Sequence, residues 1–361
     1  MNLADSDNFR ELFLNNTPLL DVRAPVEFAQ GAFPGAVNIP LLDDEQRHEV
    51  GIEYKQKGQD AAIALGNQLA TESIRSQRLR DWTQFVEAHP QGYLYCFRGG
   101  LRSRTAQQWL KASGVEYPLI KGGYKAMRGF LIQETERLTN QFPMVAVTGL
   151  TGTAKTVLIN ELANSIDLEG LAHHRGSAFG KRAKGQPAQI DFENQLAIQL
   201  MQREHQGISQ LVVEDEGRMI GRVNMPLPLR QKMTEIPLVV VEADWQTRFE
   251  QLRQDYVVAD WPEYRDLYGD DEGWHQYGES LLKAIDGIKK RLGGECHLEL
   301  RALIEQGVIS RNQQTLENNL LAVITVLMKQ YYDPMYHYQM KQKAQRVIFR
   351  GTREEVREFL S

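Results

Sequence analysis

Cysteine is scarce in this chain, and its scarcity limits what the thiols can do. Cys96 and Cys296 are the two cysteines among 361 residues. Two thiols exclude a disulfide framework and a zinc site built from four cysteines. Each cysteine is therefore either structural or reactive, and the residues around it decide which. Cys296 has a neighbouring histidine but no second ligand pair, so we expect it to be structural.

Long hydrophobic runs are also missing. No apolar stretch approaches the roughly 18 to 20 residues that cross a bilayer. The first residues, MNLADSDNFRELF, lack the basic and then apolar order of a secretory signal. We therefore expect a cytoplasmic protein that does not enter a membrane. The net charge of −5 also argues against a surface that is basic throughout and binds nucleic acid everywhere, although residues 170–190 form a local basic patch.

The residues that are present favour two α/β domains. Hydrophobic residues make up 42% and charged residues 25%, as in soluble globular proteins. The length exceeds that of most single cores, and short apolar strands alternate with helical segments, which predicts parallel sheets covered by helices. In the first 137 residues we expect strands at 18–22, 36–40 and 92–97 and helices at about 43–57, 60–89 and 103–112.

A polar connector, LTNQF, followed by Pro143, separates this block from a new strand at 144–149. The sequence therefore predicts a first domain over 1–137 and a second over 138–361. Further strands are expected at 210–214 and 237–243. Beyond about residue 244 the chain has a mostly helical pattern.

The segment CFRGGLRS at 96–103 places Cys96 at the end of a predicted buried strand, followed by a glycine-rich turn and a helix. In open α/β sheets ligands bind at this end of the strands, and such a turn directs backbone N–H groups toward an anion. We expect this loop to stabilise Cys96 as a nucleophilic thiolate. The expected binding residues are Arg98, Gly99, Gly100 and Arg102. The alternative is an inert cysteine that closes a strand.

The segment DVRAPVEFAQGAFPGAVNIP at 21–40 resembles the entry motif of rhodanese domains. In rhodanese loops the arginine usually lies five positions after the cysteine, whereas Arg102 lies six positions after Cys96. The longer C-x5-R loop is similar to that of tyrosine phosphatases, which surrounds a tetrahedral phosphate. It therefore suits a phosphorus-bearing donor of sulfur or selenium.

The segment GLTGTAKT at 149–156 follows a valine-rich strand and precedes a helical stretch, which is the context of a phosphate-binding loop. Its amides would surround phosphate oxygens, Lys155 would reach the terminal ones, and the Thr156 hydroxyl would face Mg2+ if one is bound. The expected binding residues are Gly149, Thr151, Gly152, Thr153, Lys155 and Thr156. Ala154 replaces the usual second glycine and should weaken binding if the position is left-handed.

Three acids at 214–216 end the predicted strand at 210–214. Asp215 is the candidate Walker B residue, as a carboxylate beside Mg2+-bound water or as a general base. A solvated acidic turn is an equally good interpretation. The sequence indicates no dedicated metal site.

The pairing of both loops, together with YKQKGQDAAIALG at 54–66, GGYKAMR at 122–128, HHRGSAFG at 173–180 and EDEGRMIG at 214–221, resembles the tRNA 2-selenouridine synthase family over essentially the whole chain. The resemblance implies a rhodanese-like domain followed by a P-loop domain of the NTPase type with a helical C-terminal part. It also implies glycine at position 154.

The activity implied by this resemblance replaces sulfur with selenium in the wobble 2-thiouridine of tRNA anticodons. Geranyl diphosphate would first alkylate the sulfur, with Lys155 at the diphosphate. Selenophosphate would then supply selenium through a perselenide on Cys96. Arg175 and Ser177 are expected to contact phosphate or nucleotide, unless they belong to an ordinary turn. Two rival hypotheses are a C-x5-R phosphatase with a P-loop regulator and a non-catalytic tRNA-binding scaffold.

Overall fold

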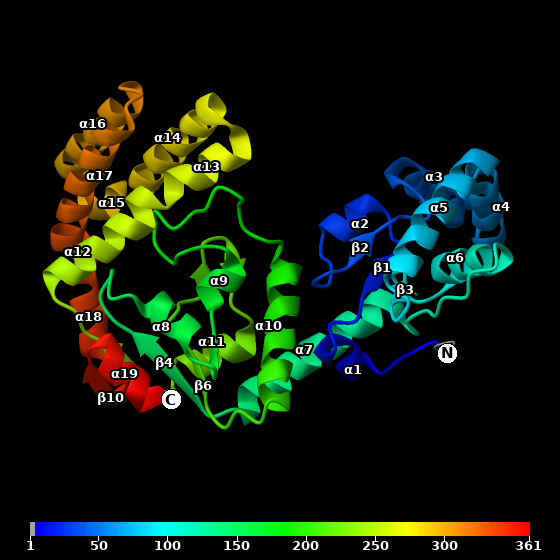
Figure 1. Cartoon of the computed structure of the whole chain (residues 1–361), viewed down its shortest axis with the longest axis horizontal. Helices are drawn as coiled ribbons and strands as arrows, with labels where there is room; N and C mark the ends of the chain where they lie inside the picture. The colour runs from blue at the N-terminus through cyan, green and yellow to red at the C-terminus, as the bar shows by residue number, and fades with distance from the viewer. Residues whose placement is uncertain (1–3) are drawn as a thin grey trace. The chain divides into compact units, whose positions relative to one another are not determined.

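The computed structural model describes residues 4–361, which form two compact units (Figure 1). The first unit comprises the chain up to Leu138 together with 188–206, and the second comprises 139–187 and 207–361. One helix from the middle of the expected second domain, α10 (Gln189–His205), is therefore part of the first unit.

The first unit contains a parallel sheet in the order β2-β1-β3, with β1 (Leu19–Asp21), β2 (Val37–Asn38) and β3 (Tyr93–Tyr95). The predicted strands at 18–22, 36–40 and 92–97 are confirmed. Buried Leu20, Leu94 and Trp82 belong to the core on which the surrounding helices pack. The helices are α1 (Phe9–Leu14), α2 (Pro25–Ala29), α3 (Asp44–Lys57), α4 (Gln59–Leu69), α5 (Glu72–Ala88), α6 (Leu101–Ala112) and α7 (Gly123–Gln141).

The prediction of one helical stretch at 60–89 is wrong in its continuity, because the structure divides these residues between two helices, α4 and α5. The break falls at Ala70 and Thr71. The Thr71 side chain accepts a hydrogen bond from the backbone N–H of Ile74 and so begins α5 as an N-cap.

The second unit contains a parallel sheet in the order β10-β9-β4-β6-β5. Every residue of β4, β6 and β9 is buried, as expected for central parallel strands rich in valine and leucine. The strands are β4 (Met144–Thr148), β5 (Ser165–Ile166), β6 (Leu211–Glu214), β9 (Leu238–Val241) and β10 (Val347–Gly351). The three predicted strands of this domain are confirmed, whereas β5 and β10 were not expected.

Helices fill most of the second unit after β9. In Figure 1 the yellow to orange helices α13, α14, α16 and α17 pack together, and their core includes Trp261, Tyr277, Ile285 and Ile304. This part contains α12 (Trp245–Arg253), α13 (Asp260–Tyr268), α14 (Asp270–Gly287), α15 (Lys289–Leu292), α16 (Gly294–Ile309), α17 (Gln313–Leu327), α18 (Asp333–Lys343) and α19 (Arg353–Leu360).

Two π-helical segments interrupt these helices, η1 (Gln254–Val258) and η2 (Met328–Tyr332). The smaller elements are α8 (Lys155–Glu161), α9 (Leu168–Ala172), β7 (Met219–Ile220), β8 (Val223–Asn224), α11 (Leu227–Met233) and the short 3-10 helix η3 (Ala344–Arg346). Within residues 4–361, every helix is too short or too polar to cross a membrane.

Candidate active sites

Cys96 lies directly after β3, at the base of a large cavity in the first unit. Its Sγ is 3.2 Å from the Ser103 hydroxyl in the first turns of α6. The residue is only 3% exposed, yet it lines a cavity of about 1170 Å³. Cys96 is therefore a buried residue on the lining of this cavity.

The start of α7 fixes the orientation of the cysteine loop. The backbone N–H groups of Tyr124 and Lys125 donate to the carbonyls of Cys96 and Phe97, each at 2.9 Å. A Cβ on Gly123 would lie 2.2 Å from the Cys96 carbonyl oxygen, so a residue with a side chain does not fit there. Within the described chain the N–H groups of residues 97–102 find no acceptor, which leaves them available to an anion.

Arg102 does not point freely into the loop, because it pairs with Glu27. Its guanidinium donates to both carboxylate oxygens, at 2.5 and 3.1 Å. Although burial opposes the effect, Arg102 lowers the pKa of Glu27 below its usual range. Arg98 lines the same cavity, and Arg47 lies 3.9 Å from Glu27. An anion at Cys96 would therefore compete with Glu27 for Arg102.

The arginine of the rhodanese-like entry motif is structural. Arg23 is buried, donates to Asp21 at 2.6 and 2.8 Å and to the Gly31 carbonyl, and lies over the ring of Tyr124. These contacts tie β1 to the start of α7.

Residues 149–154 form a loop between β4 and α8, and Lys155 and Thr156 begin α8, as predicted for a phosphate-binding loop. Glycine is needed at two positions, since a Cβ on Gly149 would lie 2.5 Å from the Val241 carbonyl oxygen and one on Gly152 2.6 Å from that of Arg248. Thr153 bonds back to the Leu150 carbonyl through both its backbone N–H and its hydroxyl. In the described residues the N–H groups of 150–152 and 154–156 have no acceptor.

Ala154 occupies the left-handed region, with φ 59° and ψ 35°. Position 154 is therefore left-handed, which is the conformation in which we expect alanine to weaken phosphate binding. For a residue with a Cβ this conformation costs on the order of 1 kcal/mol relative to glycine.

The Lys155 ammonium group folds back over its own loop. Its Nζ donates to the carbonyls of Gly149 and Leu150, at 2.9 and 3.2 Å. Burial lowers the pKa of Lys155 because it disfavours the charged ammonium group. A bound anion would have the opposite effect and stabilise the charged form. The Thr156 hydroxyl donates to Glu169 at 3.1 Å.

Acidic side chains gather beside this loop. Burial, followed by the nearby Glu169 carboxylate, raises the pKa of Glu216 to about 8. Glu214 is buried and accepts from the Leu168 N–H. Asp215, the candidate Walker B residue, accepts two hydrogen bonds from Lys343, at 2.7 and 2.9 Å. Over residues 4–361, three or more His, Cys, Asp or Glu side chains nowhere converge as metal ligands.

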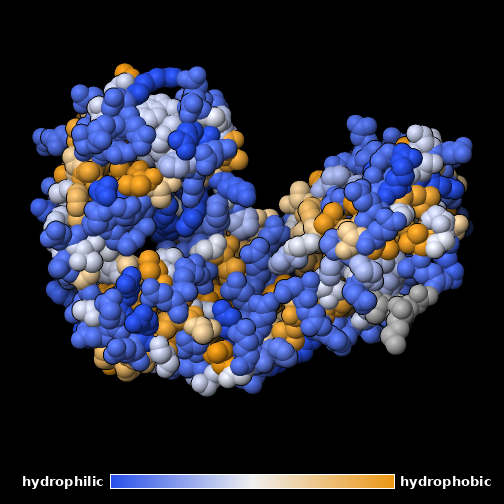
Figure 2. Space-filling model, viewed as in Figure 1, coloured by the Kyte–Doolittle hydropathy of each residue, from blue (hydrophilic) through white to orange (hydrophobic). Residues whose placement is uncertain are grey.

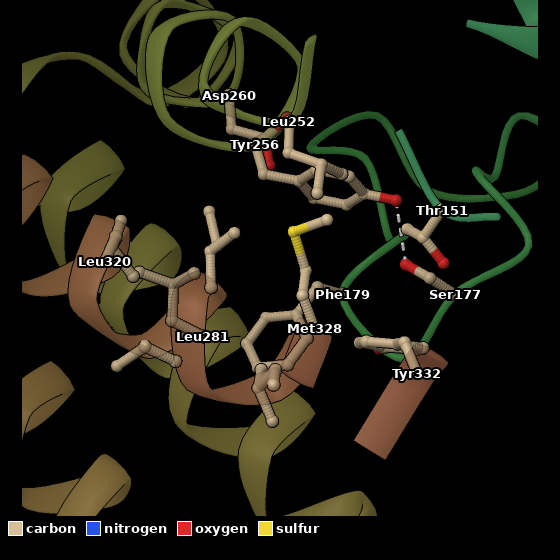
Figure 3. Close-up of a pocket in the computed structure, with 13 residues that line it drawn as sticks. Thr151, Ser177, Phe179, Leu252, Tyr256, Asp260, Leu281, Leu320, Met328 and Tyr332 are labelled. Atoms are coloured by element: carbon tan, nitrogen blue, oxygen red, sulfur yellow. Dashed lines mark hydrogen bonds between the residues drawn. The ribbon is translucent and has the colours of Figure 1, made fainter. Parts of the chain in front are cut away.

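An apolar pocket opens beside the phosphate-binding loop, and Thr151 belongs to both (Figure 3). Its unfilled volume is about 40 Å³. The π-helical segments supply Tyr256, Met328 and Tyr332, and π-helical turns of this kind are frequent at functional sites. The remaining lining residues are Ser177, Phe179, Leu252, Asp260, Leu281, Leu320, Val323, Ile324 and Leu327.

Arg175 and Ser177 tie the loop at 173–187 to this pocket. Ser177 lies 2.9 Å from the Tyr256 hydroxyl, as the dashed line in Figure 3 shows. Arg175 donates to Asp260 at 2.6 Å and lies over the Tyr256 ring. Burial raises the pKa of Asp260 to about 6 despite this arginine. Arg175 and Ser177, which were predicted to contact phosphate or nucleotide, therefore both form hydrogen bonds within the protein.

Comparison with known proteins identifies the family. The sequence profile described as "Rhodanese-like domain" matches residues 6–129, and the profile described as "tRNA 2-selenouridine synthase AAA domain" matches residues 142–361. A protein named tRNA 2-selenouridine synthase from Bordetella petrii is 48% identical over 99% of this chain and 96% of its own length. The chain belongs to the tRNA 2-selenouridine synthase family.

Other members are equally similar. Proteins with the same name from Pseudomonas putida and Cupriavidus pinatubonensis are 49% and 50% identical over 99% of this chain, covering 96% and 98% of their own lengths.

One residue that holds the second site of this tRNA 2-selenouridine synthase family member was not predicted. Buried Arg248, on α12, donates to the Thr151 carbonyl at 2.9 Å and pairs with Asp333 at 2.5 and 3.1 Å. It connects the phosphate-binding loop to α18. Its sequence surroundings, DWQTRFEQLR, resemble any amphipathic helix, so only the fold reveals this role.

Proposed function

We propose that this chain converts the wobble 2-thiouridine of tRNA to 2-selenouridine in two steps, with geranyl transfer at the phosphate-binding loop and selenium transfer at Cys96. The observation that carries the proposal is the apolar pocket beside that loop. A diphosphate site that continues into an apolar pocket suits a ligand with a charged head and a hydrocarbon tail, whereas a nucleotide would need polar groups for its base and ribose.

In the first step the thiocarbonyl sulfur attacks the terminal carbon of geranyl diphosphate. A carbon–sulfur bond forms, the carbon–oxygen bond breaks, its electron pair leaves with diphosphate, and the base loses its N3–H proton to water. The N–H groups of 150–152 and 154–156 and the Lys155 ammonium would stabilise the charge that develops on the leaving group. The prenyl chain would enter between the two π-helical segments, and because the unfilled volume is only about 40 Å³, lining side chains such as the flexible Met328 would have to move to admit it.

Mg2+ would find few protein ligands at this loop. The Thr156 hydroxyl and the Glu169 carboxylate, 3.1 Å apart, are the groups that suit it. The ion would neutralise diphosphate charge and take most of its remaining ligands from diphosphate and water.

In the second step the Cys96 thiolate attacks the selenium of selenophosphate. A sulfur–selenium bond forms, and the selenium–phosphorus electron pair stays on phosphorus, which is released as phosphite after protonation. The terminal selenium then attacks C2 of the geranylated base, and geranylthiolate leaves with the carbon–sulfur electron pair. An external thiol finally attacks Cys96 sulfur, which releases 2-selenouridine and leaves a disulfide that a second thiol reduces.

The loop at Cys96 has the groups that this step requires. Its unpaired N–H groups and Arg98 would bind the phosphoryl oxygens. Arg102 would also bind them if it breaks its hydrogen bonds to Glu27. Phosphorus NMR distinguishes this route from direct attack of selenophosphate on the base. Selenium transfer through the Cys96 perselenide releases phosphite. Direct attack of selenophosphate on the base, followed by hydrolysis, releases phosphate, and this product would show that Cys96 does not carry the selenium.

The pocket is tested with Ile324→Trp, which places a large side chain on its wall, and Ile309→Trp, which changes a residue on α16 that is 74% exposed. Geranyl transfer to 2-thiouridine in an anticodon stem–loop RNA should fall about tenfold or more in the first variant and stay unchanged in the second. The affinity for inorganic diphosphate should be the same in both. Unaltered geranyl transfer by Ile324→Trp would remove the pocket from the proposal.

A further inference from the structure

The cavity above Cys96 is larger than a selenium donor requires. Its volume of about 1170 Å³ exceeds even the roughly 300 to 1,000 Å³ of sites for drug-sized ligands. We propose that its apolar side binds the prenyl chain of the S-geranylated wobble nucleotide during selenium transfer. This inference rests on the proposed function, and it gives the first unit a prenyl-binding site of its own, separate from the pocket in the second unit.

The two helices α3 and α4 contribute much of the cavity lining. The residues that α4 contributes to the cavity recur with helical spacing and so define one face of that helix. They are Gln59, Ala62, Ile63, Gly66 and Asn67, followed by Ala70 at the C-cap. More than one face of α3 meets the cavity, through Arg47, His48, Val50, Gly51, Ile52, Tyr54 and Lys55.

Small residues keep this wall open. Gly51 and Gly66 lie inside helices, where glycine costs roughly 0.5 to 1 kcal/mol relative to alanine. Packing does not require either glycine. A Cβ on Gly51 would meet nothing within 4 Å, and one on Gly66 would meet only Val50, at 3.8 Å. Glycine at these positions leaves space in the cavity, which is the feature that a bulky ligand needs.

Apolar side chains surround the opening of the cavity. Ile52, Tyr54, Phe97 and Leu101 all line it, and each is between 36% and 57% exposed. Figure 2 shows hydrophobic residues gathered among hydrophilic ones on the visible surface of this unit. Leu41, Val50 and Trp109 also line the cavity and pack in the same hydrophobic cluster as Cys96.

Cationic side chains also line the cavity. Arg47 and Lys55 on α3 and Arg98 in the cysteine loop line it, and Arg102 reaches it with its partner Glu27. A cavity that offers both apolar and cationic side chains suits a nucleotide that carries a phosphate and a prenyl chain. Selenophosphate by itself would use only the cationic side chains.

The proposed selenium-transfer step brings the prenyl chain close to Cys96. When selenium attacks C2, the new carbon–selenium bond forms as the carbon–sulfur bond breaks, so the departing sulfur and its prenyl chain are held within bonding distance of the Cys96 perselenide. The chain must then lie either in this cavity or in water. Burial of its apolar surface stabilises the complex by roughly 25 cal/mol per Å², which favours the cavity.

The test compares two RNA substrates with the intact protein, anticodon stem–loops carrying S-geranyl or S-methyl 2-thiouridine. With selenophosphate, wild type should show a KM lower by about tenfold or more for the S-geranyl RNA. Ile63→Asn, which places an amide on the cavity wall, should abolish that preference, because the KM for the S-geranyl RNA rises more than the KM for the S-methyl RNA. Leu65→Asn, the same kind of change on a side chain of α4 outside the cavity, should keep the preference.

A second readout reports occupancy of the cavity directly. S-geranyl 2-thiouridine nucleoside should slow the alkylation of Cys96 by iodoacetamide in wild type and in Leu65→Asn, and should not do so in Ile63→Asn. Equal KM values for the two RNAs, or equal protection in the two variants, would overturn the inference while leaving the proposed function intact. If wild type forms no selenouridine from S-geranyl RNA, the proposed function itself fails.

Discussion

At the scale of single residues, the two sites resemble each other in how a charged group is held. Arg102 pairs with Glu27 and Asp215 pairs with Lys343, so in each site a predicted catalytic residue has a partner within the protein. These partners lie 75 and 128 positions away along the chain. Neither pair is visible in the sequence, because ion pairs at such separations depend on the completed fold.

Ala154 gives the first residue-scale prediction. Ala154→Gly should raise the affinity for inorganic diphosphate about fivefold, corresponding to about 1 kcal/mol, because glycine adopts the left-handed conformation at no steric cost and lacks the methyl group. Ala154→Val should weaken binding, since a β-branched residue fits this conformation worse. Calorimetric titration measures both. Unchanged or weaker binding by Ala154→Gly would contradict the phosphate-loop assignment.

Glu216 gives a prediction about pH. Its pKa is raised from 4.5 to about 8, so between these values the unfolded chain ionises while the folded chain keeps the proton. The second unit should therefore lose stability as pH rises from about 5 to 8. Glu216→Gln cannot ionise and should show a flatter dependence. Thermal midpoints at pH 6 and 8 measure this, and parallel shifts in wild type and variant would count against the buried proton.

At the scale of elements, the sequence predicts the parts with strong local signals. Valine-rich strands and the two glycine loops were found where expected, because their patterns report burial and backbone conformation directly. The two-residue strand β5 and the strand β10, whose residues alternate between half-buried and exposed, carry no such pattern. The apolar pocket was also missed, since its walls come from segments spread over residues 151–332.

Helix α10 is the element whose place differs most from expectation, and Asn194 explains why it joins the first unit. This buried side chain donates to the Ala32 carbonyl at 2.7 Å and accepts from Arg128 at 2.9 Å. Asp191 accepts from the Ala32 N–H. These are polar contacts between distant segments, so helical periodicity alone assigns the helix to neither domain.

A substitution tests this placement. Asn194→Ala should destabilise the first unit by about 1 kcal/mol, because the Ala32 carbonyl loses a donor and Arg128, which keeps its ion pair with Glu193, loses an acceptor. Diphosphate binding in the second unit should stay unchanged. Gln199→Ala, a half-buried position on the same helix, is the control. Denaturation with separate probes for each unit gives the answer, and a loss confined to the second unit would contradict the assignment.

At the scale of the whole molecule, each unit contains a complete candidate site of its own. The cysteine cavity is lined entirely by residues of the first unit, and the phosphate-binding loop with its pocket entirely by residues of the second. This division suits the proposed function, in which two reactions act on one RNA and the product of the first is the substrate of the second. Damage to either site should therefore stop the pathway at a different nucleoside.

Mass analysis of tRNA nucleosides tests this claim most directly. Cells that lack the gene are complemented with wild type, Cys96→Ser or Lys155→Ala. We predict that Cys96→Ser accumulates geranylated 2-thiouridine without selenouridine, whereas Lys155→Ala retains unmodified 2-thiouridine. Normal selenouridine in the Cys96→Ser cells, or the same nucleoside accumulating in both variants, would contradict the assignment of one step to each site.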